Sequence, residues 1–158
     1  MALKSLASKT RSRSLLVGNS SLFGGFYNIA TISVGSGGSS TITFSSIPNT
    51  YTHLQIRAIS RKASAGGGDG IFIRLNSDTG TNYSVHDLTG DGSALSVYAG
   101  ASTSQMNPTT TATSSHSTNV FGAQVWDILD YANTNKYKTL RAMNGFDNNG
   151  SGKVRWGS

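Results

Sequence analysis

Apolar and polar residues alternate in short segments along most of the chain. In Leu54–Ala58 the apolar side chains occupy every second position, and Ile71, Ile73 and Leu75 repeat this pattern after a glycine-rich loop. A period of two places successive side chains on opposite faces of a β-strand. The pattern therefore predicts strands, and no segment after residue 25 shows the period of a helix.

The same criterion predicts about nine strands, each bounded by turn-forming residues. They cover residues 29–34, 40–47, 54–58, 71–75, 83–88, 95–98, 120–129, 137–143 and 154–156. Gly100–Thr118 is rich in Ser and Thr, and we expect it to form one long exposed loop. Strands at intervals of roughly 8–12 residues favour an all-β fold, an antiparallel β-sandwich or jelly roll, over any α/β arrangement.

Composition supports this prediction. The 158 residues include 19 Gly, 25 Ser and 17 Thr, no Cys and no Glu. High Gly and Ser content is also typical of disorder, but here these residues separate short alternating apolar segments. The absence of Cys excludes disulfides and thiolate metal sites. No apolar run approaches the roughly 20 residues that a membrane-spanning helix needs, so we expect no membrane association of that kind.

The N-terminal residues 1–25 have no sustained period, and we interpret them as an extended basic arm that precedes a sandwich domain of residues 26–158. Residues 1–62 contain seven Lys and Arg and no acidic residue. Such a patch favours docking on an acidic surface. Nucleic acid is the less favoured partner, because the arm has no aromatic residues to stack on bases. A disordered tail is the alternative interpretation. The expected protein-docking residues are Leu3, Lys4, Leu6, Lys9, Arg11, Arg13, Leu15, Leu16 and Val17.

No motif indicates catalysis. We expect His53 and His86 on outward strand positions and His116 exposed in the Ser/Thr loop, and the chain has no nucleophile-elbow sequence. Asp127, beside Trp126 on a predicted strand, is the only acidic residue in an unusual setting, and a hydrogen bond or salt link explains it best. We therefore predict a protein that is not an enzyme, with no catalytic residues.

Cofactors and metals are equally unsupported by the sequence. The loops at 76–82 and 147–152 are rich in Asp and Asn, as calcium loops are, but the bidentate Glu that closes an EF-hand is missing. Gly66–Gly68 lacks the Lys and the following helix of a phosphate-binding loop. We interpret these segments as turns and predict neither cofactor nor metal.

Three stretches resemble a family of short virion structural proteins of tailed phages, common in marine and cyanobacterial phages. They are SSIPNTYTHLQIR at 45–57, FIRLNSDTGTNYS at 72–84 and LDYANTNKYKTLRAM at 129–143, and the start MALKSLASKTRSRSLLVGN is similar too. The resemblance implies a β-sandwich of the capsid-decoration or tail-fibre type, with Tyr83 and Tyr137 supplying apolar area. Members of the family typically continue beyond the position of Trp156, so a C-terminal truncation or completion by a neighbouring subunit is also implied.

From this resemblance we expect a capsid decoration or cement protein that is docked by its N-terminal arm. It would be located in the virion, assembled in the host cytoplasm. Its expected partners are the major capsid protein or tail proteins of the same phage, and further copies of the chain, with a trimer favoured. The alternative is a tail-fibre or receptor-binding module that recognises a host surface glycan through Tyr98, Trp126 or Trp156.

Overall fold

The computed structural model describes residues 26–65 and 70–158. It separates into two units, Met1–Ser33 and Val34–Ser158. The docking residues expected between Leu3 and Val17 lie outside the described residues, and so does the expected arm as a whole.

The two strands expected nearest the N-terminus are absent. Residues 26–33 of the first unit and 34–53 of the second contain no strand, although a turn closes where Gly38 N donates to Gly35 O at 3.0 Å. Ile29, Ile42 and other apolar side chains of these segments are exposed. A strand is stable only within a sheet, and the predicted segments pair with no other strand among the described residues. The prediction of strands at 29–34 and 40–47 was therefore wrong.

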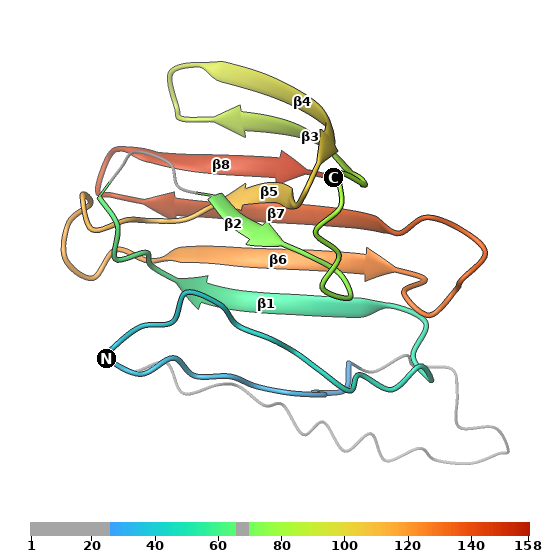
Figure 1. Ribbon diagram of the computed structural model, residues 1–158. Helices are drawn as coiled ribbons and strands as arrows, with labels where there is room; N and C mark the ends of the chain where they lie inside the picture. Colours follow the sequence, from blue (N-terminus) through green and yellow to red (C-terminus); the bar gives the residue numbers. More distant parts are fainter. Residues whose placement is uncertain (1–25, 66–69) are drawn as a thin grey trace, which may run out of the picture. The chain divides into compact units, whose positions relative to one another are not determined.

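The remaining expected strands are present, and β5 adds one that was not expected (Figure 1). Six of them form an antiparallel sheet in the order β1-β6-β7-β8-β3-β4, and β2 pairs antiparallel with β5 in a second sheet. The strands are β1 (Leu54–Ser60), β2 (Gly70–Ile73), β3 (Tyr83–Gly90), β4 (Leu95–Thr103), β5 (Met106–Thr110), β6 (Gly122–Leu129), β7 (Thr139–Asp147) and β8 (Gly152–Gly157).

The two sheets form an all-β sandwich with no helix in the described residues, which confirms the predicted fold class. Figure 1 shows β2 and β5 lying across one face of the large sheet, and β5 contacts β3, β7 and β8. The apolar core lies on this inner face. It is built on five buried residues, Met106, Trp126, Ile128, Leu140 and Ala142, with Leu54, Ile56, Ile71, Ile73 and Tyr83 packed against them.

The Ser/Thr segment 100–118 does not form the exposed loop that its composition predicts. It contains the end of β4 and all of β5, and Thr109, Thr111 and Thr113 are fully buried. Thr111 Oγ1 donates to Ser60 O at 2.8 Å and accepts from Gln124 Nε2 at 3.1 Å. Because their hydroxyls find partners, Thr side chains can be buried here, and composition alone gave the wrong answer.

Candidate functional site

The outer face of the large sheet, opposite the core, is the most extensive feature that remains without a covering layer in the described structure. Burial alternates strictly along β6, where Gly122, Gln124, Trp126 and Ile128 are buried and the residues between them are not. The intervening side chains therefore point to the other face. Residues directly opposite in the register share a face, so the pairing of strands defines the rows of this outer face.

Two neighbouring rows of the outer face are almost entirely apolar. The first row runs through Arg57, Val125, Met143, Trp156, Leu88 and Val97. The second row runs through Ile59, Ala123, Gly145, Val154, Gly90 and Leu95. Each row crosses all six strands, so the apolar surface is continuous from one edge of the sheet to the other.

These side chains are strongly exposed. The exposed fractions are 76% for Ile59, 80% for Val97 and 74% for Leu95, and Trp156 near the centre is 45% exposed. Ala123 and Gly145 are small, and they form the floor of a shallow hollow of about 490 Å³ between larger neighbours. Soluble monomers seldom expose a contiguous apolar patch above a few hundred Å², so this outer face has the character of an interface.

A polar row borders the apolar rows on one side. Asp127 accepts a hydrogen bond from Gln55 Nε2 at 2.7 Å and pairs with Arg141 Nη2 at 3.1 Å. The Gln55 hydrogen bond, followed by the Arg141 guanidinium, lowers the pKa of the Asp127 carboxyl below its ordinary value. The hydrogen bond or salt link that the sequence predicted for Asp127 is confirmed, since both are present, and the carboxylate is held in place at the rim of the apolar surface.

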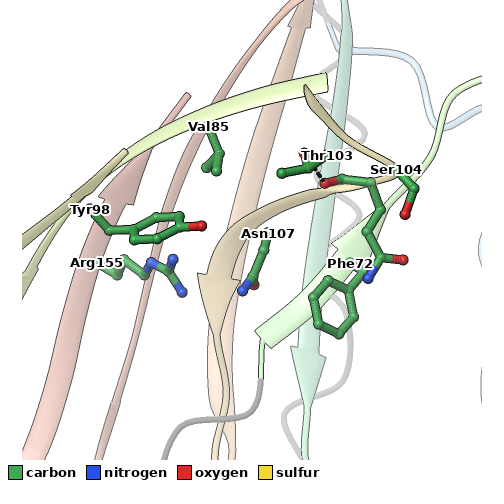
Figure 2. Close-up of a pocket in the computed structure, with 8 residues that line it drawn as sticks. Phe72, Val85, Tyr98, Thr103, Ser104, Asn107 and Arg155 are labelled. Carbon is green, nitrogen blue, oxygen red and sulfur yellow. Dashed lines mark hydrogen bonds between the residues drawn. The ribbon is translucent and has the colours of Figure 1, made fainter. Parts of the chain in front are cut away.

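A second feature is a cavity of about 500 Å³ on the other side of the large sheet (Figure 2). Phe72 and Tyr98 supply aromatic rings to its wall, and both are about half exposed. Figure 2 shows the Tyr98 ring beside the Arg155 guanidinium, with Asn107 facing them from β5. Val85, Thr103, Ser104 and Gln105 complete the lining.

The charged group in this cavity is neutralised from within the chain. Arg155 Nη2 pairs with Asp87 Oδ2 at 2.5 Å, and both side chains are nearly buried. Arg155 Nη1 donates to Thr109 O at 3.4 Å. Arg155 Nε and Asn107 Oδ1 are buried without a hydrogen-bond partner. The cavity thus combines aromatic rings with hydrogen-bonding groups that carry no net charge. Such a lining suits a neutral polar ligand better than an anion.

The three histidines lie in different environments. His53 and His86 are exposed, as predicted. His116 is partly buried and not exposed as expected: its Nδ1 contacts Thr113 N at 3.0 Å, and its ring packs edge-on against Phe146 at 4.6 Å. The chain turns back on itself here, and this places the imidazole against the core edge. The histidines form no common cluster in the described structure.

The aromatic residues expected to contact a glycan separate into three environments. Trp126 is 3% exposed and belongs to the core, so it is unsuitable as a stacking surface. Tyr98 lines the cavity, and Trp156 lies on the outer face. Tyr137, for which the family resemblance implied an apolar packing role, is 99% exposed in the β6–β7 loop, because the loop carries it away from both sheets.

The Asp-rich loops act as turns. Asp78 Oδ1 accepts from Gly80 N at 2.8 Å, and Asn82 Nδ2 donates to the same carboxylate. In residues 26–65 and 70–158 no group of three or more His, Cys, Asp or Glu side chains is arranged to hold a metal ion. Within these same ranges, no helix has the length and apolar character needed to cross a bilayer.

Comparisons with protein-family models, with curated proteins and with solved structures find no match.

The outer face was not predicted as a site, although the sequence carries a signal for it. In β6 the apolar Val125 stands next to Trp126, and in β4 Val97 stands next to Tyr98. Adjacent apolar residues in a strand place apolar side chains on both faces. Such a strand is expected to be covered on both sides, whereas the described structure covers only one.

Proposed function

We propose that this chain is a structural subunit of a virion, a capsid decoration protein of a tailed phage, and not an enzyme. The observation that carries the proposal is the uncovered apolar outer face, which spans six strands and is larger than an isolated soluble protein normally exposes. A protein built to pack against other proteins needs such a surface. The phage assignment is supported by the sequence resemblance over 45–57, 72–84 and 129–143.

The arm of residues 1–25 would provide the attachment to the particle. Its Lys and Arg residues complement an acidic protein lattice, and its Leu residues add apolar contacts. Many copies on a symmetric shell would strengthen attachment beyond the affinity of a single arm, because linked sites bind at a high effective concentration.

Cryo-electron microscopy of purified particles tests this proposal. We expect density that fits the sandwich over the capsid shell, with the arm in contact with the major capsid protein. A variant without residues 1–25 should fold but fail to attach when added to particles that lack the protein. A second variant replaces Lys4, Lys9, Arg11 and Arg13 by Ala and should weaken attachment in a salt-dependent way. Absence of the protein from the particle would overturn the proposal.

A second candidate function is recognition of a neutral glycan in the cavity, which would place the protein on a tail fibre. The observation in its favour is the combination of the Tyr98 and Phe72 rings with the buried Asn107 Oδ1, which has no donor. Aromatic rings with a few fixed polar groups are the usual composition of small-molecule sites. Glycan-array binding that is lost in Tyr98→Ala and kept in the matched control Tyr137→Ala would establish it. No binding to any glycan by the unmodified chain would exclude it.

A further inference from the structure

We infer that the outer face binds the outer face of a second copy of this chain, in a face-to-face pair with twofold symmetry. This inference rests on the proposed function and deepens it, since it names the partner that covers the apolar surface and puts a twofold pair in place of the trimer favoured from the sequence. It rests on three properties of the outer face: its area, the match between its two halves, and the position of its polar row.

The exposed area fits one subunit of a stable pair. Seven large apolar residues of the two rows are 38–80% exposed, and together they expose at least several hundred Å² of apolar surface. A standard specific interface buries about 800 Å² on each partner. Each copy therefore presents much of the area that a specific pair requires, and the polar row and main chain add to it.

Twofold symmetry matches apolar strands with apolar strands. The midpoint of the order β1-β6-β7-β8-β3-β4 lies between β7 and β8. A twofold axis along the strands at this midpoint places β7 opposite β8 of the second copy, β6 opposite β3, and β1 opposite β4. Such an axis does not shift residues along the strands, so each row faces the same row of the other copy.

Most of the facing residues are apolar on both copies; the exception in the first row is Arg57 at the sheet edge, which lies opposite Val97 of the second copy. In the first row Met143 lies opposite Trp156 of the second copy, and Val125 lies opposite Leu88. In the second row Val154 lies opposite Gly145, whose missing side chain forms part of the hollow. Large side chains near the axis thus meet either apolar partners or the hollow. Aligned sheets pack in this way about 10 Å apart.

The polar row also agrees with this arrangement. Gln55, Asp127 and Arg141 form the polar row on β1, β6 and β7. The same row continues across β8 to His86 on β3, which exchanges backbone hydrogen bonds with Ser158. The twofold axis brings Asp127 opposite His86 of the second copy. An imidazole N–H can donate to the carboxylate, so the border of the interface gains a complementary contact twice.

Sedimentation velocity of the full-length chain, from about 1 to about 300 μM, tests the inference. We expect a reversible monomer–dimer equilibrium, together with a blue shift of Trp156 emission as concentration rises. Trp156 is half exposed in the single chain, whereas Trp126 is already buried and contributes a constant signal. A chain that stays monomeric, or that forms a trimer, would overturn the face-to-face pair.

Substitutions locate the interface. Met143→Lys places a charge near the axis and should raise the dimer dissociation constant by about tenfold or more. Val154→Lys provides a second test if the first variant fails to fold. Tyr137→Lys is the matched control, since this side chain is 99% exposed and lies off the sheet, and its dissociation constant should equal that of the parent. Equal association of all three variants would refute the assignment to the outer face.

The symmetry is tested separately through His86. His86→Asp places a carboxylate opposite Asp127 of the second copy and should weaken the dimer, whereas His86→Lys should strengthen it. No difference between these variants would exclude the twofold arrangement. Failure here is distinguishable from failure of the proposed function: a monomer that is still found on particles refutes only the pair, and a dimer absent from particles refutes only the virion assignment.

Discussion

Replacement of Thr111 by Val should destabilise the fold, although it removes a single hydroxyl group. Thr111 is fully buried between the sheets. Its Oγ1 donates to Ser60 O at 2.8 Å and accepts from Gln124 Nε2 at 3.1 Å, while Ser60 Oγ donates to Gln124 Oε1 at 3.1 Å. The Thr111 hydroxyl is therefore the centre of a hydrogen-bonded group that links the segment after β5 to β1 and β6.

The magnitude follows from the groups left without a partner. Gln124 is 2% exposed, so its amide N–H cannot turn to water when the acceptor is lost. A buried donor without an acceptor costs about 1–3 kcal/mol, and the lost bond to Ser60 O costs about 1 kcal/mol. Val fills nearly the same volume as Thr, so no large cavity term is added. We expect the free energy of unfolding to fall by about 3 kcal/mol.

Urea denaturation, followed by fluorescence of the buried Trp126, measures this change. The matched control is Thr110→Val: Thr110 is 3% exposed and its Oγ1 has no hydrogen-bond partner, so this variant should be neutral or slightly more stable. The double variant Thr111→Val with Gln124→Met removes donor and acceptor together, and its cost should be below the sum of the single costs. Equal stability of Thr110→Val and Thr111→Val would refute the reasoning.

Two further predictions concern backbone space and pH. Gly152→Ala should lower the free energy of unfolding, measured in urea, by about 1–3 kcal/mol, because a Cβ there would lie 2.4 Å from Phe146 O. The control Gly37→Ala has open space around it and should be neutral. Equal stability of the two variants would contradict the register of β7 and β8. The pKa of the Asp127 carboxyl is lowered in the folded chain, first of all by the Gln55 hydrogen bond. The ionised carboxylate therefore stabilises the fold fully at pH values above the ordinary Asp pKa of about 3.9, and this contribution is lost as the pH falls through the lower pKa of the folded chain. Asp127→Asn should therefore show a weaker loss of unfolding free energy between pH 5 and acid pH than the parent chain, and parallel pH profiles would show that the contact does not contribute.

Seven of the eight strands in the described part of the chain could be located from the sequence because alternation is a local property. Leu54–Ala58 and Ile71–Leu75 have period two, and the structure forms β1 and β2 there. Ile42 and Phe44 alternate just as clearly, yet residues 40–47 form no strand. Alternation shows that a segment is able to form a strand, whereas pairing depends on a neighbour that local pattern does not identify.

Composition failed where hydrogen bonds compensated for polarity. Thr109, Thr111 and Thr113 were expected in an exposed loop and are buried, because their hydroxyls find partners. Thr109 Oγ1 donates to Ile71 O within the small sheet, and Thr111 Oγ1 donates to Ser60 O of the large sheet. Trp126 was considered as a surface for sugars and is instead in the core, since it shares the inner face with Gln124 and Ile128. A shift of one residue along the strand moves a side chain to the opposite face of the sheet, and so reverses its role.

The sequence by itself determined the all-β class, the places of seven of the eight strands in the described residues, and a hydrogen bond or salt link at Asp127, because these follow from period two and from local polarity. Only the tertiary structure decided the order β1-β6-β7-β8-β3-β4 and the position of the small β2-β5 sheet on one face. The strand order brings Val125, Met143, Trp156 and Leu88 into one row, although they are far apart along the chain. In the described residues the small sheet covers the inner face alone, and the apolar surface of the outer face has no covering layer.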